Sequence, residues 1–327
     1  MLARLPAEDS RVMVGPRVGE DAAVVDLGDR LLVATTDPIT FAGDLIGWYA
    51  VHINANDVAA MGAAPRWFLG TLLLPETAKE SDVGPIFDQI AESCREVGAT
   101  PIGGHTEITI GIDRPILVAS MLGEAVRDRL LTSAGARPGD EVVLAGPIAI
   151  EGTALLAREA GAALRRQGVS GDAVEQARSL LLEPGISVVP AARAAAHVGG
   201  VSAMHDPTEG GLATGLKEIA LASGVGLDID GERIPVLGLT REVCAALDLD
   251  ALGLIASGSL LVTVGAGARE ALLRELSDAG VEAAAIGRVV PEGEGLWLRA
   301  AGERRPLPDF PRDEIARFLA GRPEART

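Results

Sequence analysis

The sequence predicts an α/β (α+β) protein built from two domains. Short apolar runs typical of buried strands alternate along the chain with stretches of helical periodicity. The chain has 327 residues, 48% of them hydrophobic, which is enough for two domains that each bury a core. A segment rich in turn formers, 134–140, precedes a new strand and marks the boundary. We therefore expect domains at 1–134 and 135–305, followed by a loosely ordered tail at 306–327.

The first domain is expected to contain two strands and two helices. An apolar run at 31–36 ends at Asp37 and is typical of a buried strand, and 115–122 has the pattern of a second strand. Residues 44–62 place apolar side chains three or four residues apart, which predicts a helix. Residues 82–97 predict a more regular amphipathic helix with one apolar stripe, made of Val83, Ile86, Phe87, Ile90, Cys94 and Val97.

The second domain repeats the theme of an apolar strand, a polar or glycine-rich break, and a helix. The same two periodicities distinguish its strands from its helices. They predict strands at 141–145, 201–204, 259–264 and 281–290, and helices near 151–166, 172–183, 212–223 and 269–279.

Composition excludes several classes of function. The formal net charge is −17, so nucleic acid and anionic membranes are poor partners. No apolar run approaches the roughly 18 residues of a membrane span, and the charged first stretch does not resemble a signal peptide. The two cysteines, Cys94 and Cys244, fall in helical patterns and are too few for a disulfide framework. We expect a cytoplasmic protein with buried thiols.

Four aspartates, Asp21, Asp37, Asp57 and Asp206, stand in short polar breaks within apolar sequence. Mg²⁺ prefers oxygen ligands and is usually held by one or two carboxylates together with water and phosphate. Carboxylates supplied by several segments are what a polyphosphate bound through several magnesium ions requires. The set therefore indicates an enzyme that uses ATP or another nucleotide with Mg²⁺, without specifying what is phosphorylated.

Each aspartate also has a structural interpretation. Asp57 lies inside a predicted helix among apolar residues, where an unpaired buried carboxylate is costly; a metal ion or a local hydrogen bond would satisfy it. Asp37, before Pro38, could begin a turn, and Asp21 could lie in a surface loop.

A glycine-rich segment, Gly103-Gly104-His105-Thr106-Glu107, forms a further break. Two glycines allow a backbone to approach a ligand closely, and His105 can coordinate a metal or donate to phosphate. A tight turn with incidental polar residues is the alternative.

The segment Pro207-Thr208-Glu209-Gly210-Gly211 precedes the predicted helix at 212. Free N–H groups at a helix start attract phosphate, so Thr208, Gly210 and Gly211 are candidates for binding a nucleotide. A carboxylate beside such a site, Asp206, requires a cation between itself and the phosphate. The alternative is that Thr208 serves only as the N-cap of the helix.

Other motifs are absent or structural. No phosphate-binding Gly-x-x-x-x-Gly-Lys-Ser/Thr loop and no Gly-x-Ser-x-Gly hydrolase motif occurs, and the histidines lack the spacing of zinc ligands. His52 is expected to be packed and hydrogen-bonded rather than to bind a ligand.

In order and spacing, these motifs resemble the ATP-binding superfamily that includes aminoimidazole ribonucleotide synthetase, selenophosphate synthetase, thiamine-monophosphate kinase and the hydrogenase-maturation protein HypE. The resemblance extends from Gly19 to Val290. It is strongest to the HypE branch, through Gly19-Glu20-Asp21-Ala22-Ala23-Val24, Thr36-Asp37, Asn56-Asp57-Val58-Ala59-Ala60-Met61-Gly62-Ala63, Gly139-Asp140, His205-Asp206-Pro207-Thr208-Glu209-Gly210-Gly211-Leu212 and Ser257-Gly258-Ser259-Leu260-Leu261.

The resemblance implies a first domain that forms a barrel with a second subunit, hence a homodimer, and ATP bound between the two domains. It implies that the four aspartates hold magnesium on the phosphates. It also implies that Asn56 and the backbone of Gly104, His105 and Thr106 contact the nucleotide.

Two features depart from the HypE branch. That branch ends in a cysteine that accepts a carbamoyl group, whereas the last cysteine of this sequence is Cys244. It also carries Asp-Thr-Lys where this chain has His105-Thr106-Glu107. We therefore expect a Mg²⁺-dependent, ATP-using enzyme that phosphorylates an oxygen of a small amide, carboxylate or phosphate-acceptor substrate. Its expected catalytic residues are His105, Glu107 and Asp206. A true HypE-like maturation factor and a nucleotide-binding regulator without turnover stay open as alternatives.

Overall fold

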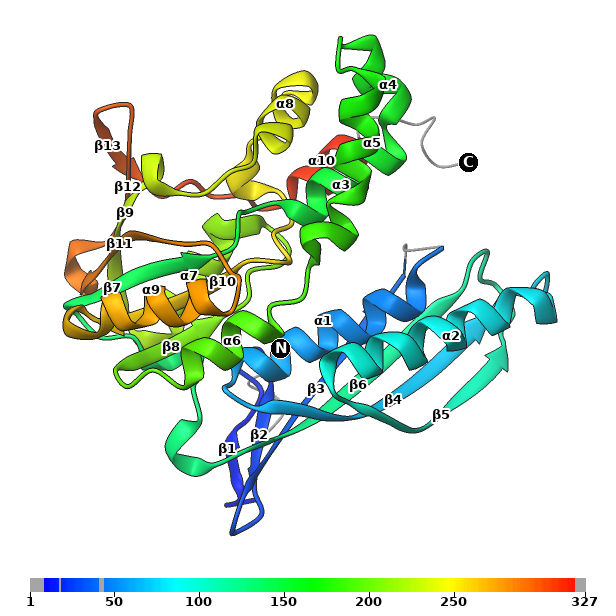
Figure 1. Ribbon diagram of the computed structural model, residues 1–327, viewed down its shortest axis with the longest axis horizontal. Helices are drawn as coiled ribbons and strands as arrows, with labels where there is room; N and C mark the ends of the chain where they lie inside the picture. The colour runs from blue at the N-terminus through cyan, green and yellow to red at the C-terminus, as the bar shows by residue number, and fades with distance from the viewer. Residues whose placement is uncertain (1–8, 18, 41–43, 321–327) are drawn as a thin grey trace. The chain divides into compact units, whose positions relative to one another are not determined.

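The computed structural model describes residues 9–17, 19–40 and 44–320 (Figure 1). The chain divides into two compact units, Met1–Leu130 and Leu131–Thr327. Each unit combines one mixed β-sheet with helices, which confirms the predicted α/β (α+β) class. Within the described ranges, no helix combines the length and apolar character needed to cross a membrane.

The first unit is a six-stranded sheet covered by two helices. The strand order is β1-β2-β3-β6-β4-β5, and β4 and β5 form the parallel pair. Helix α1 lies against β3, β4 and β6, and α2 packs beside α1 and β5 (Figure 1). The elements are β1 (Val12–Val14), β2 (Ala23–Asp26), β3 (Leu31–Ile39), α1 (Ile46–Ala60), β4 (Ala64–Leu74), α2 (Glu80–Val97), β5 (Thr100–Ile108) and β6 (Ile116–Ala125).

Helix α1 is enclosed on almost every side, which explains why its sequence is apolar all round. Gly47 allows α2 to approach, because a Cβ at this position would lie 2.5 Å from the carbonyl oxygen of Ile86. Both helices predicted for this unit are confirmed. The strands β1, β2 and β4 were not predicted, because their sequences are short or lack a clean alternation of polar and apolar residues.

Strand β5 is an exposed edge of the sheet, and all nine of its residues are exposed. The prediction of a polar break or tight turn at Gly103–Glu107 is wrong, because these residues continue the strand. Gly104 is needed for strand pairing: a Cβ there would lie 2.1 Å from the carbonyl oxygen of Gly70 in β4. The glycine thus serves the approach of a neighbouring strand.

The second unit contains a seven-stranded sheet in the order β13-β12-β9-β11-β7-β10-β8. All its strand pairs are antiparallel except β9 with β12. Its strands are β7 (Asp140–Ala145), β8 (Val201–His205), β9 (Val225–Asp230), β10 (Leu260–Gly265), β11 (Ala283–Pro291), β12 (Leu296–Ala300) and β13 (Glu303–Pro306). Its helices are α3 (Ile150–Glu159), α4 (Gly161–Arg166), α5 (Gly171–Ser179), α6 (Val189–Ala196), α7 (Gly211–Ser223), α8 (Gly238–Leu247), α9 (Arg269–Asp278) and α10 (Glu314–Ala320).

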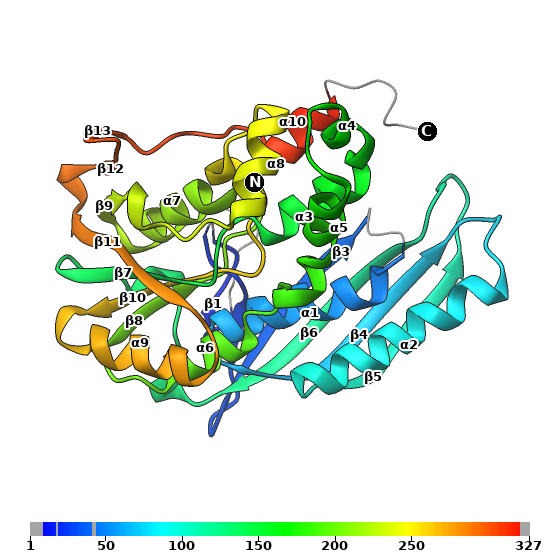
Figure 2. The ribbon, with the colours of Figure 1, turned by 45° about the horizontal axis from the view of Figure 1, so that its top comes forward.

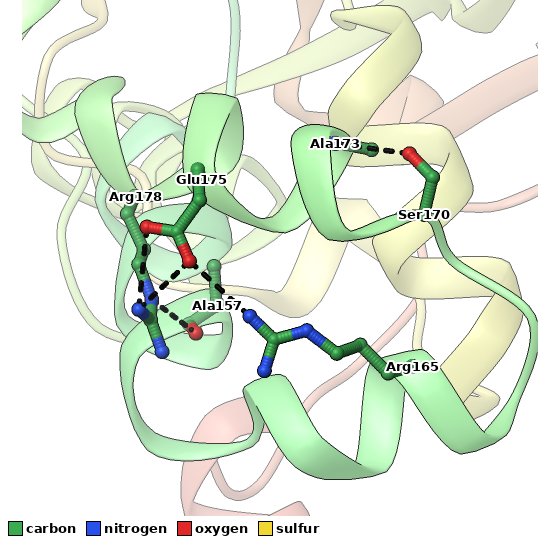
Figure 3. A network of polar contacts seen from close by, with 6 residues as sticks. All are labelled: Ala157, Arg165, Ser170, Ala173, Glu175 and Arg178. Atoms are coloured by element: carbon green, nitrogen blue, oxygen red, sulfur yellow. Dashed lines mark hydrogen bonds and ion pairs between the residues drawn. The ribbon is translucent and has the colours of Figure 1, made fainter.

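A polar network joins the first three of these helices, and Figure 3 shows it from close by. Glu175 of α5 accepts hydrogen bonds from Arg165 of α4 and from Arg178, and Arg178 Nε also donates to the carbonyl of Ala157 in α3 at 2.9 Å. Ser170 caps the start of α5. The single helix predicted at 151–166 is therefore two helices, held in place by a third.

The tail predicted to be loosely ordered is packed over its described part, 306–320. Leu307 is buried, the Phe310 ring fills the space beside Gly253, and Asp309 pairs with Lys217 of α7 at 2.5 Å. Hydrogen bonds within the unit and the short helix α10 complete the attachment. The sequence contains many Pro and Arg residues here, and the contacts that attach it to the unit are with residues distant in the chain.

The edge strand β5 leads us to expect a homodimer. An exposed row of backbone N–H and C=O groups is a ready template for strand pairing, and Ile102 and Ile108 are 52% and 64% exposed. Replacing both with lysine should weaken dimerisation by roughly a hundredfold or more, because burial of each is worth about 1.5–3 kcal/mol. Light scattering over a dilution series measures this.

The matched control is Leu221→Lys on α7, where the side chain is 67% exposed in the other unit. The control should leave the mass unchanged. A monomer at micromolar concentration for the unaltered protein would contradict the expected dimer.

Candidate functional site

A buried carboxylate joins a helix to a strand in the first unit. Asp57 lies in α1 and is 9% exposed, and its Oδ2 accepts a hydrogen bond from Thr35 Oγ1 of β3 at 2.6 Å. The same hydroxyl lies 3.4 Å from the carbonyl oxygen of Asp21. Thr35 therefore brings together two of the four predicted aspartates. The hydrogen-bond alternative for Asp57 is therefore present.

Asp37 is fixed through its backbone. It lies inside β3, so its interpretation as a turn residue is wrong. Its N–H donates to Asn54 Oδ1 at 3.1 Å, and Asn54 Nδ2 donates to the carbonyl of Ala50 one turn earlier in α1. Asn54 was missed by sequence reasoning, although an asparagine buried in an apolar helix is itself a signal. Its neighbour Asn56 is also fully buried.

A pocket of about 470 Å³ opens in the first unit. Asp21 and Thr35 line it, together with Arg17, Glu20, Thr36 and Ser120. Carboxylate and hydroxyl oxygens suit a hard cation, and a guanidinium suits phosphate. The pocket therefore offers both oxygen ligands for a metal ion and a guanidinium for phosphate, as a metal-bound phosphate requires.

His105 and Glu107 lie far from these aspartates within the unit. In the sheet register Asp37 pairs with Ala119, Ala119 with Gly70, and Gly70 with Gly104. Asp37 and Gly104 are therefore three interstrand steps apart, a distance of about 14 Å. His105 Nε2 lies 3.5 Å from Glu107 Oε2 on the exposed edge strand. The structure of one unit does not bring the two predicted catalytic residues to the aspartates.

In the second unit, Asp206 follows β8 and is buried. The preceding residue, His205, contacts Glu218 of α7 through Nε2 at 3.0 Å and Ser133 Oγ through Nδ1 at 3.4 Å. Gly215 of α7 allows this close packing, because a Cβ there would lie 2.6 Å from Cβ of Pro207. The residues on both sides of Asp206 thus pack against α7.

The start of α7 differs from the prediction. The N-cap is Gly210, with a left-handed φ of 77°, and no side chain caps the helix, so Thr208 is not the N-cap. Gly210 N donates to Asp313 Oδ2 at 2.8 Å, and Gly211 N donates to the carbonyl of Thr208 at 3.0 Å. The two glycine N–H groups predicted to face phosphate are therefore already engaged within the unit.

Sequence reasoning missed Glu151, which is fully buried in the first turn of α3. Burial raises the pKa of Glu151 to about 7; the nearby Ser257 hydroxyl opposes this shift, and the charges of Glu209 and Asp313 add to it. Burial also raises the pKa of Asp313. An acidic residue inside the apolar run 148–152 was the signal that could have identified it.

His52 and the two cysteines have the structural roles expected of them. His52 is 4% exposed, contacts Glu96 through Nε2 at 3.2 Å and packs against the Trp48 ring. Burial lowers the pKa of His52, and Glu96 partly opposes this. Burial raises the pKa values of the Cys94 and Cys244 thiols to about 12, so both stay neutral and unreactive at ordinary pH.

Among the residues that the structure describes, no three His, Cys, Asp or Glu side chains gather closely enough to form a metal site by themselves. A magnesium ion here would need phosphate and water to complete its ligands, as is usual for this metal.

The fold and these motifs agree with a single family. Residues 19–125 match the N-terminal domain model of AIR synthase related protein, and residues 137–297 match its C-terminal domain model. The chain is 33% identical over 287 residues to carbamoyl dehydratase HypE of Cupriavidus necator, covering 85% of this chain and 78% of that protein. The chain belongs to the AIR synthase related family, which confirms the resemblance seen in the sequence.

Solved structures give the same result. The crystal structure of Escherichia coli HypE has a TM-score of 0.75 at 26% identity, covering 94% of this chain and 96% of that one. A hydrogenase maturation protein HypE in complex with ATP has a TM-score of 0.70 at 26% identity, with coverage of 96% and 91%.

Glu151 should make stability depend on pH. Because its pKa rises from 4.5 in the unfolded chain to about 7 in the fold, its contribution is complete below pH 4.5 and is lost as the pH rises through 7. The loss amounts to about 3 kcal/mol. Glu151→Gln, which stays neutral, should therefore be more stable than the unaltered protein above pH 8 and similar to it at pH 4.5. Urea unfolding at several pH values measures the difference.

Glu159→Gln, an exposed position on the same helix, is the control and should follow the unaltered protein at every pH. A constant difference between Glu151→Gln and the unaltered protein across the pH range would show that Glu151 does not titrate there.

Proposed function

We propose that this protein is a Mg²⁺-dependent enzyme that uses ATP to phosphorylate an oxygen of a small amide, carboxylate or phosphate-acceptor substrate. The observation that carries the proposal is the hydrogen bond from Thr35 to Asp57, because Thr35 lines a pocket that Asp21 also lines. A buried carboxylate destabilises the fold unless it is hydrogen-bonded or paired. Support also comes from the likeness to a HypE structure solved with ATP.

The residues of the first pocket fit a magnesium ion bound to phosphate. Asp21, which lines the pocket, and Asp57, which is hydrogen-bonded to the lining residue Thr35, would supply one carboxylate each, within the usual number for Mg²⁺. Arg17 would contact the phosphates. Bound Mg²⁺ would neutralise charge on the phosphates, which matters for a chain of net charge −17. Asp37 would hold a further ion, and Asp206 of the second unit would do the same there. Asn56, Gly103, Gly104, Thr106 and the segment from Thr208 to Gly211 would border the nucleotide.

His105 and Glu107 would act at the acceptor. Because they lie on the open edge of the sheet, about 14 Å across the strands from Asp37, they would serve a site completed by the second copy of a dimer. There the imidazole would donate a hydrogen bond to phosphate or acceptor. Glu107, 3.5 Å away, would hold the ring in position. Asp206 would act in the transfer from the second unit.

A second candidate is the reaction of its relatives, ATP-dependent dehydration of a carbamoyl group. The observation that favours it is 33% identity to a carbamoyl dehydratase over most of both chains. The state of the thiols weighs against it, because Cys94 and Cys244 are buried in helices with strongly raised pKa values. A regulator without turnover is less favoured, because the similar proteins include a carbamoyl dehydratase, which is an enzyme.

ATP should raise the Tm only when Mg²⁺ is present, because bare ATP would be repelled by the acidic pocket. At a concentration 100 times Kd the stabilisation is about 2.7 kcal/mol, which is a shift of several degrees. Asp57→Asn keeps an oxygen that can accept from Thr35 but removes the charge, so the variant should fold and lose the shift. Differential scanning fluorimetry with MgCl₂ or EDTA measures both effects.

The control is Asp113→Asn, an exposed aspartate of the same unit whose partner is Arg114. It should keep the full shift. Equal stabilisation in EDTA would contradict the metal requirement. If Asp57→Asn unfolds but its refolded fraction binds nucleotide normally, Asp57 has only a structural role.

The chemistry separates the two candidates. Incubated with ATP and a carbamoyl-donating partner, the protein should gain no stable adduct by intact-mass spectrometry, because neither thiol is exposed or ionised. Product should instead form on a free acceptor from a panel of amides, carboxylates and phosphate acceptors. An adduct of carbamoyl mass that disappears in Cys94→Ser or Cys244→Ser would favour the dehydratase.

A further inference from the structure

The second unit contains a second hollow, with a volume of about 740 Å³, that none of the residues above explains. It lies among α8, β12, β13 and α10, and Figure 2 shows α8 and α10 next to each other. Its floor is apolar: Ile148, Ile234 and Leu298 are each at most 4% exposed. Such a floor can cover the apolar body of a small ligand.

Three guanidinium groups stand around this floor, each from a different element: Arg241 of α8, Arg305 of β13 and Arg317 of α10. Arg317 is engaged, donating to Glu314 and to the carbonyl of Asp248 at 2.7 and 2.6 Å. Arg241 and Arg305 make no ion pair within the described part of the chain. Arg241 and Arg305 thus line the hollow without an ion pair, although Asp248, Asp250 and Glu314 line the same hollow.

The orientation of Arg305 follows from the strand. The preceding residue, Arg304, stacks over the Trp297 ring, 4.2 Å from its centroid. Successive side chains of a strand point to opposite faces, so Arg305 faces the hollow that it lines. Arg304 and Arg305 are therefore neighbours with different surroundings, so Arg304 can serve as a control for Arg305.

The acidic residues of the rim already have partners. Glu314 accepts from Arg317 and from the N–H of Asp250, and the carboxylate of Asp250 accepts from the N–H of Leu252. Asp248 lies in the electrostatic field of Arg317. Arg241 and Arg305 are therefore the arginines of the hollow that can donate to an anion without breaking an ion pair seen in the described part of the chain.

We propose that this hollow binds a small organic anion, with its apolar body on the floor of Ile148, Ile234 and Leu298 and its acidic group between Arg241 and Arg305. The ligand class is a carboxylate, sulfonate or phosphate monoester with an apolar portion. Arg241 and Arg305 would each donate a charge-assisted hydrogen bond to the acidic group, while the apolar floor covers the rest of the ligand. The proposal is independent of the proposed ATP chemistry.

The fluorescent probe anilinonaphthalenesulfonate tests it, because it joins an apolar body to a sulfonate. Titration in saturating Mg-ATP keeps the probe from a nucleotide site. Arg241→Gln and Arg305→Gln should each weaken binding by about tenfold, through loss of a charge-assisted contact. Arg304→Gln is the matched control and should bind like the unaltered protein. Far-UV circular dichroism and Tm confirm that each variant folds.

A second variant fills the hollow. Ala245 is exposed on α8 and lines the hollow, so Ala245→Trp should fold and block the probe. The proposal is overturned if Arg304→Gln weakens binding as much as Arg305→Gln, or if the probe binds normally to Ala245→Trp. Either result would place the probe at another surface.

Discussion

The first unit depends on the hydrogen bond between Thr35 and Asp57, which joins the central strand β3 to the buried helix α1. A carboxylate at this depth destabilises the fold unless it is hydrogen-bonded or paired. Thr35 meets that requirement on one oxygen and also lies near the carbonyl of Asp21. Asn54 makes a parallel connection from α1 to the backbone of Asp37. Two polar links through an apolar interface thus fix the positions of three aspartates.

The second unit uses the same principle with different groups. His205 is held between Ser133 and Glu218, and Gly215 lets α7 approach Pro207. The carboxylate of Asp313 then accepts the N–H of Gly210, as a phosphate would at a helix start. The C-terminal segment is therefore part of the support of this loop. Its acid also adds to the negative field at the buried Glu151.

These arrangements concentrate negative charge in a protein that is already acidic. Burial is the main cause of the raised pKa of Glu151, and the nearby charges of Glu209 and Asp313 add to it. The hollow lined by Arg241 and Arg305 differs, because arginines and acidic residues line it together. The two proposed anionic ligands would be bound in different ways: the nucleotide through a cation, and the small organic anion directly by arginines.

The sequence by itself determined the α/β class, the longer helices such as α1 and α2, and the presence of acids where polar breaks interrupt apolar runs, because periodicity and local propensity are local properties. It also carried the family, through the order of its motifs. Only the tertiary structure decided that Gly103–Glu107 is an edge strand, that Asp313 occupies the start of α7, and that Glu151 is buried. Each of these depends on strand register or on contacts between residues distant in the chain, and only for Glu151 did the apolar run around it give a local signal.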